Sequence, residues 1–231
     1  MSATAVTLGE LAAVVALAQD HAFGQPAGSQ LRACLVGQWL AADEQVGERD
    51  TATTYWLSLL RFLGCTGHAH EVSVIFGDEI EARSRLLLWD ASNPSEVLRE
   101  IVSRAGAQHT GFTRVRTVAA ILAGGRRAAE MNFRTGCEVA DALSQRLGVS
   151  EDVRQGLAYT FERWNGRGLP RGVKGADIPL PMRIVHLCQE AEVLSRVLGV
   201  VEATAVLNAR AGKAYDPEVV NALVPRLPMY S

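Results

Sequence analysis

Helical periodicity runs through almost the whole chain and restricts its fold more than any other feature. Apolar residues recur three and four positions apart, and no run alternates apolar and polar residues between turn signals, as a half-buried strand would. A chain of 231 residues with 48% hydrophobic residues can bury a core without disulfides or metals. We therefore predict an all-α helical bundle of about ten helices.

Capping and breaking residues place several helix ends. Thr7 and Glu10 form a capping box, and Asp216-Pro217 is typical of an N-cap followed by the first helical residue. Gly124-Gly125 predicts a break or kink between two helices, over 113–123 and 126–147. We also expect Ser29 and Asp50 to cap helices, a helix near 70–76, one that ends near Trp164, and a linker-like stretch over 225–231.

Composition excludes some functions. Lys and Arg number 23 against 25 Asp and Glu, so a net charge of −2 offers no field for direct nucleic-acid binding. The N-terminus lacks the pattern of a signal peptide, and no run is typical of a membrane span. Cys34, Cys65, Cys137 and Cys188 have no metal-ligand spacing, which favours reduced core thiols in a cytoplasmic protein. We predict one domain over 1–231, with a weak seam near 106–111.

The residues around and after Trp164 carry an unusual motif. It combines a tryptophan, an arginine, glycines and prolines at fixed offsets, within a stretch, 165–181, too rich in Gly and Pro for a helix. Its residues are Glu162, Arg163, Trp164, Asn165, Gly166, Gly168, Pro170 and, further on, Arg183. This loop, 162–184, resembles the signature of HD-GYP domains, the all-helical metal-dependent phosphodiesterases of cyclic di-GMP. Leu169 stands where that family has Tyr.

The resemblance extends over residues 26–225 and is greater for one branch of the family. Residues 60–66, 69–71, 76–79, 137–140 and 161–164 resemble HD domains that precede a LuxR-type helix-turn-helix in bacterial regulators. The resemblance implies a downstream DNA-binding module as a partner, although no such module follows in this chain.

The positions at which the resemblance implies metal ligands hold other residues. Hydrolysis in the family needs metal ions held by His and carboxylate side chains. Those ligands correspond to the following residues here: Ser29, Arg61, Phe62, Gly136, Thr160, Phe161 and Gln189. An arginine cation at a metal centre opposes a dication, so we expect a degenerate pocket with no cofactor and no catalytic residue.

The sequence leaves an enzymatic alternative open. A metal could be held by relocated ligands, for which the candidates are His68, His70, Glu71 and Glu162, with Asp78 and His186 as further donors. His68 and His70 are two residues apart and would not share a helix face, and His186 is more typical of a satisfied core histidine.

The functional prediction is a regulatory domain in which the ancestral site no longer binds metal. It would bind a small effector or dimerise, and would signal to a DNA-binding module or another partner. The alternative is an active metal-dependent phosphohydrolase or cyclic-dinucleotide phosphodiesterase with relocated ligands, and a third reading is a ligand-free dimerisation module. Arg167, Arg171 and Lys174 in the loop could grip a phosphate, but the simpler interpretation is solvated side chains.

Overall fold

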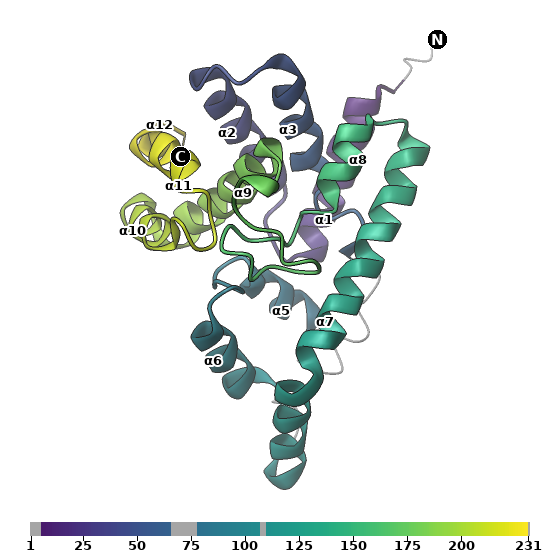
Figure 1. Cartoon of the computed structure of the whole chain (residues 1–231), viewed down its shortest axis with the longest axis vertical. Helices are drawn as coiled ribbons and strands as arrows, with labels where there is room; N and C mark the ends of the chain where they lie inside the picture. Colours follow the sequence, from purple (N-terminus) through teal and green to yellow (C-terminus); the bar gives the residue numbers. More distant parts are fainter. Residues whose placement is uncertain (1–5, 66–77, 107–109, 231) are drawn as a thin grey trace.

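The computed structural model describes residues 6–65, 78–106 and 110–230, and the regular elements in these ranges are helices (Figure 1). The α-helices are α1 Leu8–Ala22, α2 Ser29–Asp43, α3 Glu48–Leu60, α5 Glu79–Leu86, α6 Pro94–Arg104, α7 Gly111–Leu147, α8 Glu151–Leu157, α9 Leu180–Leu198, α10 Val200–Arg210, α11 Pro217–Leu223 and α12 Leu227–Tyr230. Two short 3-10 helices, Gly175–Asp177 and Val224–Arg226, complete them. The all-α prediction is confirmed. No helix within these ranges has the length and apolarity needed to cross a bilayer.

Helix α9 is the centre of the packing. It contacts α2, α3 and α10, and side chains such as Leu187 and Leu194 are fully buried. Its consecutive residues from 184 to 191 are all buried, so other parts of the protein enclose the helix on every side. One apolar cluster joins α9 to α2, α10 and α11, and a second joins it to α1, α3 and α8. The described part of the bundle thus has two large cores that share α9 and α2, and a smaller third cluster of Phe23, Phe62, Leu87 and Val193.

The structure confirms two of the predicted helix caps and contradicts two others. The capping box of Thr7 and Glu10 is present, and Asp216 caps α11 by accepting a hydrogen bond from Glu218 N at 2.9 Å. Ser29, however, is the first residue of α2, and its hydroxyl donates to Glu192 at 2.5 Å instead of capping. The N-cap of α3 is Gly47, so Asp50 lies inside the helix.

The predicted break at Gly124-Gly125 is wrong. Helix α7 runs without interruption over 37 residues from Gly111 to Leu147, along one side of the molecule and beyond the neighbouring helices (Figure 1). A glycine costs a helix only about 1 kcal/mol relative to alanine. The flanking alanine, leucine and arginine residues are strong helix formers, so two glycines do not end it.

Two more boundaries differ from expectation. Helix α8 ends at Leu157 and the chain turns before Trp164, which therefore lies in a loop. The stretch 225–231 is not a linker in its described part, because Leu227 is buried and the ring of Tyr230 packs on Trp39 at 5.4 Å. The helix predicted near 70–76 lies outside the described residues.

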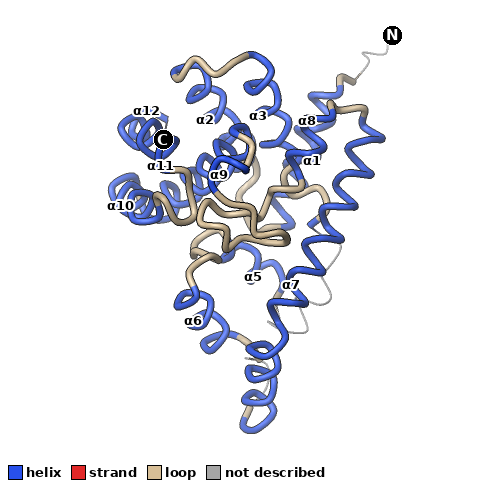
Figure 2. The backbone as a smooth tube through the Cα atoms, in the orientation of Figure 1, coloured by secondary structure: helices blue, strands red, loops and turns tan. Residues whose placement is uncertain are grey.

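The loop between α8 and α9 lies at the centre of the molecule, between α9, α5 and α7 (Figure 2). It folds on itself through a bridge between Asn165 and Lys174. Asn165 N also donates to Lys213 O at 2.8 Å, which ties the loop to the connection between α10 and α11. The glycine- and proline-rich signature is therefore an ordered loop.

Candidate functional site

Glu162 holds the signature loop in shape. Its carboxylate is fully buried and accepts hydrogen bonds from Arg171 N and Val173 N, both at 2.9 Å. From the sequence, Glu162 could accept hydrogen bonds from the glycine-rich loop or form an ion pair with Arg183, and the structure shows the first of these roles. The second, an ion pair with Arg183, is not formed, because Arg183 pairs with Asp216 at 2.5 Å.

Close backbone approach explains one glycine of the signature. A Cβ atom on Gly168 would lie 2.4 Å from both Glu162 Cα and Arg163 N, so the loop can return to its own start only with glycine there. Gly166 has a φ of 75° and also closes the turn. Trp164 is half-buried, with the Arg183 guanidinium 5.8 Å from its ring centroid. These residues fix the shape of the signature loop.

Three of the predicted pocket residues, Arg61, Phe62 and Phe161, line one cavity with residues of the signature loop. The cavity lies between the end of α3, α5 with the segment after it, α7 and the loop. Its lining residues are Arg61, Phe62, Leu86, Leu87, Ala91, Arg126, Phe133, Phe161, Arg163, Arg167, Gly168 and Leu169. The charged side chains among them are all arginines.

The other predicted pocket positions lie around this cavity and do not line it. Thr160 is buried and its hydroxyl is 3.5 Å from Arg61 O. Gly136 packs closely against Gly64: a Cβ atom added to Gly64 would lie 1.8 Å from Gly136 O. Gln189 is buried with no partner for Nε2 in the described chain. Ser29 is held by Glu192, as described above.

Arg61 is the most unusual side chain of the site. It is 3% exposed, its Nη1 donates to Val185 O at 3.3 Å, and its guanidinium lies 4.9 Å from the Phe62 ring centroid. Its Nε has no hydrogen-bond partner among the residues that the structure describes. Burial lowers the pKa of Arg61 to about 10, so the group stays charged at neutral pH.

Arg163 lies beside Arg61 and is neutralised by a buried carboxylate. Its Nη1 donates to Glu190 Oε1 at 2.7 Å, and Tyr215 donates its hydroxyl to the other oxygen of Glu190. Arg210 is 3.8 Å from the same carboxylate. One acid therefore serves two arginines directly, and in the described residues no carboxylate forms a hydrogen bond or ion pair with Arg61.

His186 is a neutral core histidine. Its Nε2 lies 3.0 Å from Thr160 O and 3.1 Å from Tyr159 O, so this nitrogen carries the proton and donates to both carbonyls. Burial, together with the cations of Arg61 and Arg163, lowers the pKa of His186 well below its usual value. With Nε2 occupied in this way, His186 does not offer that atom to a metal.

The described residues do not fit a metal centre. They contain no group of three or more His, Cys, Asp or Glu side chains placed to hold an ion. The four cysteines are free, and burial raises the pKa of Cys65 to about 12. His68, His70 and Glu71 lie outside the described residues, and Glu162 is occupied by backbone donors.

Sequence reasoning missed the contribution of α7 to the cavity. Phe133 stacks on Phe161 with ring centroids 4.2 Å apart, and Arg126, next to the break predicted at Gly124-Gly125, lines the cavity although it is exposed. Arg167 of the predicted basic cluster also lines it, whereas Arg171 packs over the Tyr159 ring at 4.3 Å. A continuous α7 would have been the signal, since 126 and 133 are seven residues apart on one helix face.

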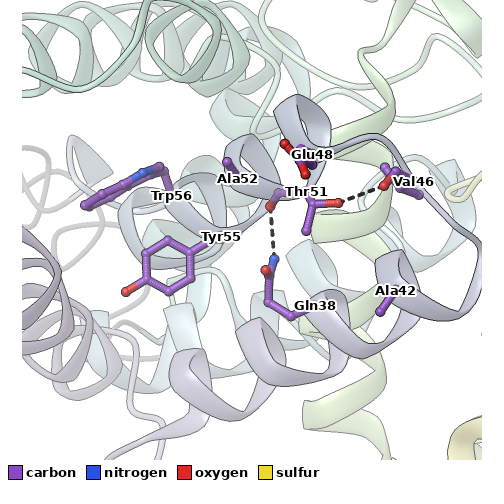
Figure 3. Close-up of a pocket in the computed structure, with 8 residues that line it drawn as sticks. All are labelled: Gln38, Ala42, Val46, Glu48, Thr51, Ala52, Tyr55 and Trp56. Atoms are coloured by element: carbon purple, nitrogen blue, oxygen red, sulfur yellow. Dashed lines mark hydrogen bonds between the residues drawn. The ribbon is translucent and has the colours of Figure 1, made fainter.

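A second hollow lies on the outer side of α2 and α3 (Figure 3). It is a shallow, open groove in which Gln38 Nε2 donates to Thr51 O at 3.1 Å and the Thr51 hydroxyl donates to Val46 O at 3.2 Å. The lining residues are Gln38, Ala42, Val46, Glu48, Thr51, Ala52, Tyr55 and Trp56. Their polar groups are spread out and largely satisfied, so the groove shows no catalytic constellation.

Comparisons with known proteins agree with the all-α fold and with the resemblance of the signature loop. The family model described as HD domain matches residues 131–219. The chain is 28% identical over 216 residues to the 3'3'-cGAMP-specific phosphodiesterase 3 of Vibrio cholerae, which covers 94% of this chain and 47% of the relative. It is 30% identical over 93 residues to the probable cyclic di-GMP phosphodiesterase of the same organism, which covers 38% of this chain and 20% of the relative.

A solved structure shows the same fold. The crystal structure of a cyclic GMP-AMP-specific phosphodiesterase from Vibrio cholerae superposes with a TM-score of 0.69 at 27% identity. The match covers 96% of this chain and 50% of that one. Residues 131–219 thus match a family model for HD domains, and the chain has the fold of HD-domain phosphodiesterases. It spans about half the length of the relatives that it matches over most of its own length.

Two predictions need correction in this light. The main functional reading, a regulatory domain without catalysis, is wrong, because the relatives that match almost the whole chain are phosphodiesterases. The prediction of no cofactor is wrong on the same ground, since HD-domain phosphodiesterases are metal-dependent. The enzymatic alternative, a cyclic-dinucleotide phosphodiesterase, agrees better with these matches.

Proposed function

We propose that this domain hydrolyses a phosphodiester bond of a cyclic dinucleotide, the reaction class of its relatives. The observation that carries the proposal is similarity along 94% of the chain to a cyclic GMP-AMP phosphodiesterase. The architecture supports it, because the cavity is bounded by the signature loop and the end of α3, where the resemblance implies the reaction centre. Cyclic GMP-AMP and cyclic di-GMP are therefore the substrates to test first.

Several parts of this proposal depend on residues that the structure does not describe. A metal ion bound by the protein would activate water and stabilise the charge that develops on the phosphate. The described residues supply no such site, so we derive no step through the metal. His68, His70 and Glu71 remain the donors proposed from sequence.

The test is a hydrolysis assay on the full chain. Chelator-treated protein is incubated with each cyclic dinucleotide and Mn²⁺, Fe²⁺, Ni²⁺ or Zn²⁺ in turn, and linear dinucleotide is measured by liquid chromatography. We expect linear product with at least one metal, loss of product in His70→Ala, and full retention in the control His21→Ala, which alters an exposed residue of α1. Absence of product with every metal would overturn the proposal.

The remaining predictions on context are untested. Homo-oligomeric assembly, cytoplasmic location and a LuxR-type module as a partner stay predictions, as does the single-domain boundary at 1–231. Size-exclusion chromatography with light scattering would decide the first of them.

A further inference from the structure

The cavity between α3, α5, α7 and the signature loop has the charge distribution of an anion site. Two of its arginines, Arg61 and Arg163, are buried at its base, whereas Arg126 and Arg167 are exposed at its edge. No aspartate, glutamate or histidine occurs among its described lining residues. Arginine side chains present planar arrays of donors that match the oxygens of a phosphate.

The arginines at the base differ in their partners. Arg163 donates to Glu190, which is also 3.8 Å from Arg210, and Arg210 is 3.5 Å from Glu96. The buried carboxylate of Asp90 also acts on the charge of Arg163. Arg61, which lines the cavity, forms no ion pair with a described residue.

Arg61 also has an unused donor. Its Nε–H is buried without a partner in the described residues, and a buried guanidinium in this state costs folding free energy that a bound anion would recover. The Thr160 and Val185 contacts on either side fix Arg61 in place. Arg61 is therefore held in place at the wall of the cavity.

The size and walls of the cavity limit what it accepts. Its volume of about 70 Å³ is well below the roughly 300 Å³ at which typical ligand pockets begin, so it has room for a phosphate group and not for a whole dinucleotide. Phe62, Phe133 and Phe161 form apolar walls. Aromatic faces of this kind stack on nucleobases, which would remain at the mouth of the cavity.

We infer that this cavity binds one phosphate of a cyclic dinucleotide through Arg61, Arg163 and Arg167, without a metal ion. The inference rests on the proposed function for its ligand class, and it concerns binding alone.

The experiment measures binding under conditions that exclude metal. Cyclic GMP-AMP is titrated into the full chain in excess EDTA and followed by isothermal titration calorimetry. We expect saturable binding that weakens when salt is raised, because the contacts are ionic. Arg167→Ala should weaken binding at least fivefold with an unchanged melting temperature, because Arg167 is exposed. Arg61→Met should weaken it at least tenfold.

A matched control separates this site from general charge effects. Arg49→Met removes one exposed arginine that pairs with Asp152, remote from the cavity lining, and should bind as the parent does. Binding that needs added Mn²⁺, or an Arg167→Ala variant with unchanged affinity, would overturn the inference.

The two proposals fail separately. Binding in EDTA without hydrolysis under any metal would overturn the proposed function and leave the anion site standing. Hydrolysis with an added metal, together with no binding in EDTA, would support the proposed function and overturn the metal-free anion site.

Discussion

Arg163 of the signature loop donates from Nη1 to Glu190 Oε1 of α9 at 2.7 Å, and both side chains are almost completely buried. This ion pair joins the loop to the central helix of the bundle. Tyr215 and Arg210 contact the other oxygen, Oε2, of the same carboxylate. The site is therefore fixed to the core by charge as well as by apolar packing.

Glu190→Gln should be strongly destabilising. It removes the negative charge that Arg163 and Arg210 share, and an uncompensated buried charge typically costs about 3 to 5 kcal/mol. Urea unfolding followed by circular dichroism measures the loss. Glu202→Gln, on the exposed side of α10, is the control and should change stability little. A loss below about 1 kcal/mol for Glu190→Gln would contradict this account.

Arg61→Met should stabilise the unliganded protein. The substitution removes a buried cation with an unpartnered Nε and keeps most of the side-chain volume, so the gain should be about 1 to 2 kcal/mol. Thermal unfolding in a phosphate-free buffer would show a higher melting temperature. A lower melting temperature would mean that the hydrogen bond to Val185 O and the contact with Phe62 outweigh the desolvation of the charge.

Stability should fall as the solution is acidified below a pH of about 6.5, the ordinary pKa of histidine. The folded state keeps His186 neutral because its pKa is lowered, whereas the unfolded chain takes up the proton. The contribution of His186 is thus fully present above that pH and is lost below it, by up to about 1.4 kcal/mol per pH unit. Urea unfolding at several pH values between about 7.5 and about 5 measures how steeply the free energy of unfolding changes with pH.

The variant His186→Gln isolates this effect. Glutamine can donate to Thr160 O but does not titrate, so the slope of stability against pH should become shallower in this range. An unchanged slope would assign the pH dependence to other groups.

Glu162→Ala should loosen the signature loop. The amides of Arg171 and Val173, which are only partly buried, lose their acceptor, at a cost of about 1 to 3 kcal/mol for the pair. Hydrogen exchange of residues 163–175 should become faster than in the parent. Glu162→Gln keeps an acceptor oxygen and should show a smaller change, and equal effects of the two variants would argue against a role for these hydrogen bonds.

Two glycine substitutions should have opposite effects. Gly168→Ala places a Cβ 2.4 Å from backbone atoms of Glu162 and Arg163 and should cost about 3 kcal/mol or more. Gly124→Ala lies in α7 with nothing within 4 Å of the new atom, and should gain about 1 kcal/mol from helix propensity. Differential scanning calorimetry of both variants tests the pair, and destabilisation by Gly124→Ala would show that α7 needs a flexible point there.

The sequence by itself determined the all-α fold and the presence of the signature loop. Local chemistry decides these features: helical spacing of apolar residues, the capping box of Thr7 and Glu10, the N-cap at Asp216, and a loop in which Gly168 has no substitute. Each depends on residues that are close together along the chain. They can be recognised without knowledge of their tertiary partners.

Only the tertiary structure decided how the cavity is built. Arg61, Arg126 and Arg163 lie far apart in the sequence and meet because α7 is continuous and α9 holds the loop through Glu190. The choice of Asp216 over Glu162 as the partner of Arg183 was likewise settled by position in space. Buried ion pairs depend on which charges the packed helices bring together, and desolvation then decides which of them can remain unpaired.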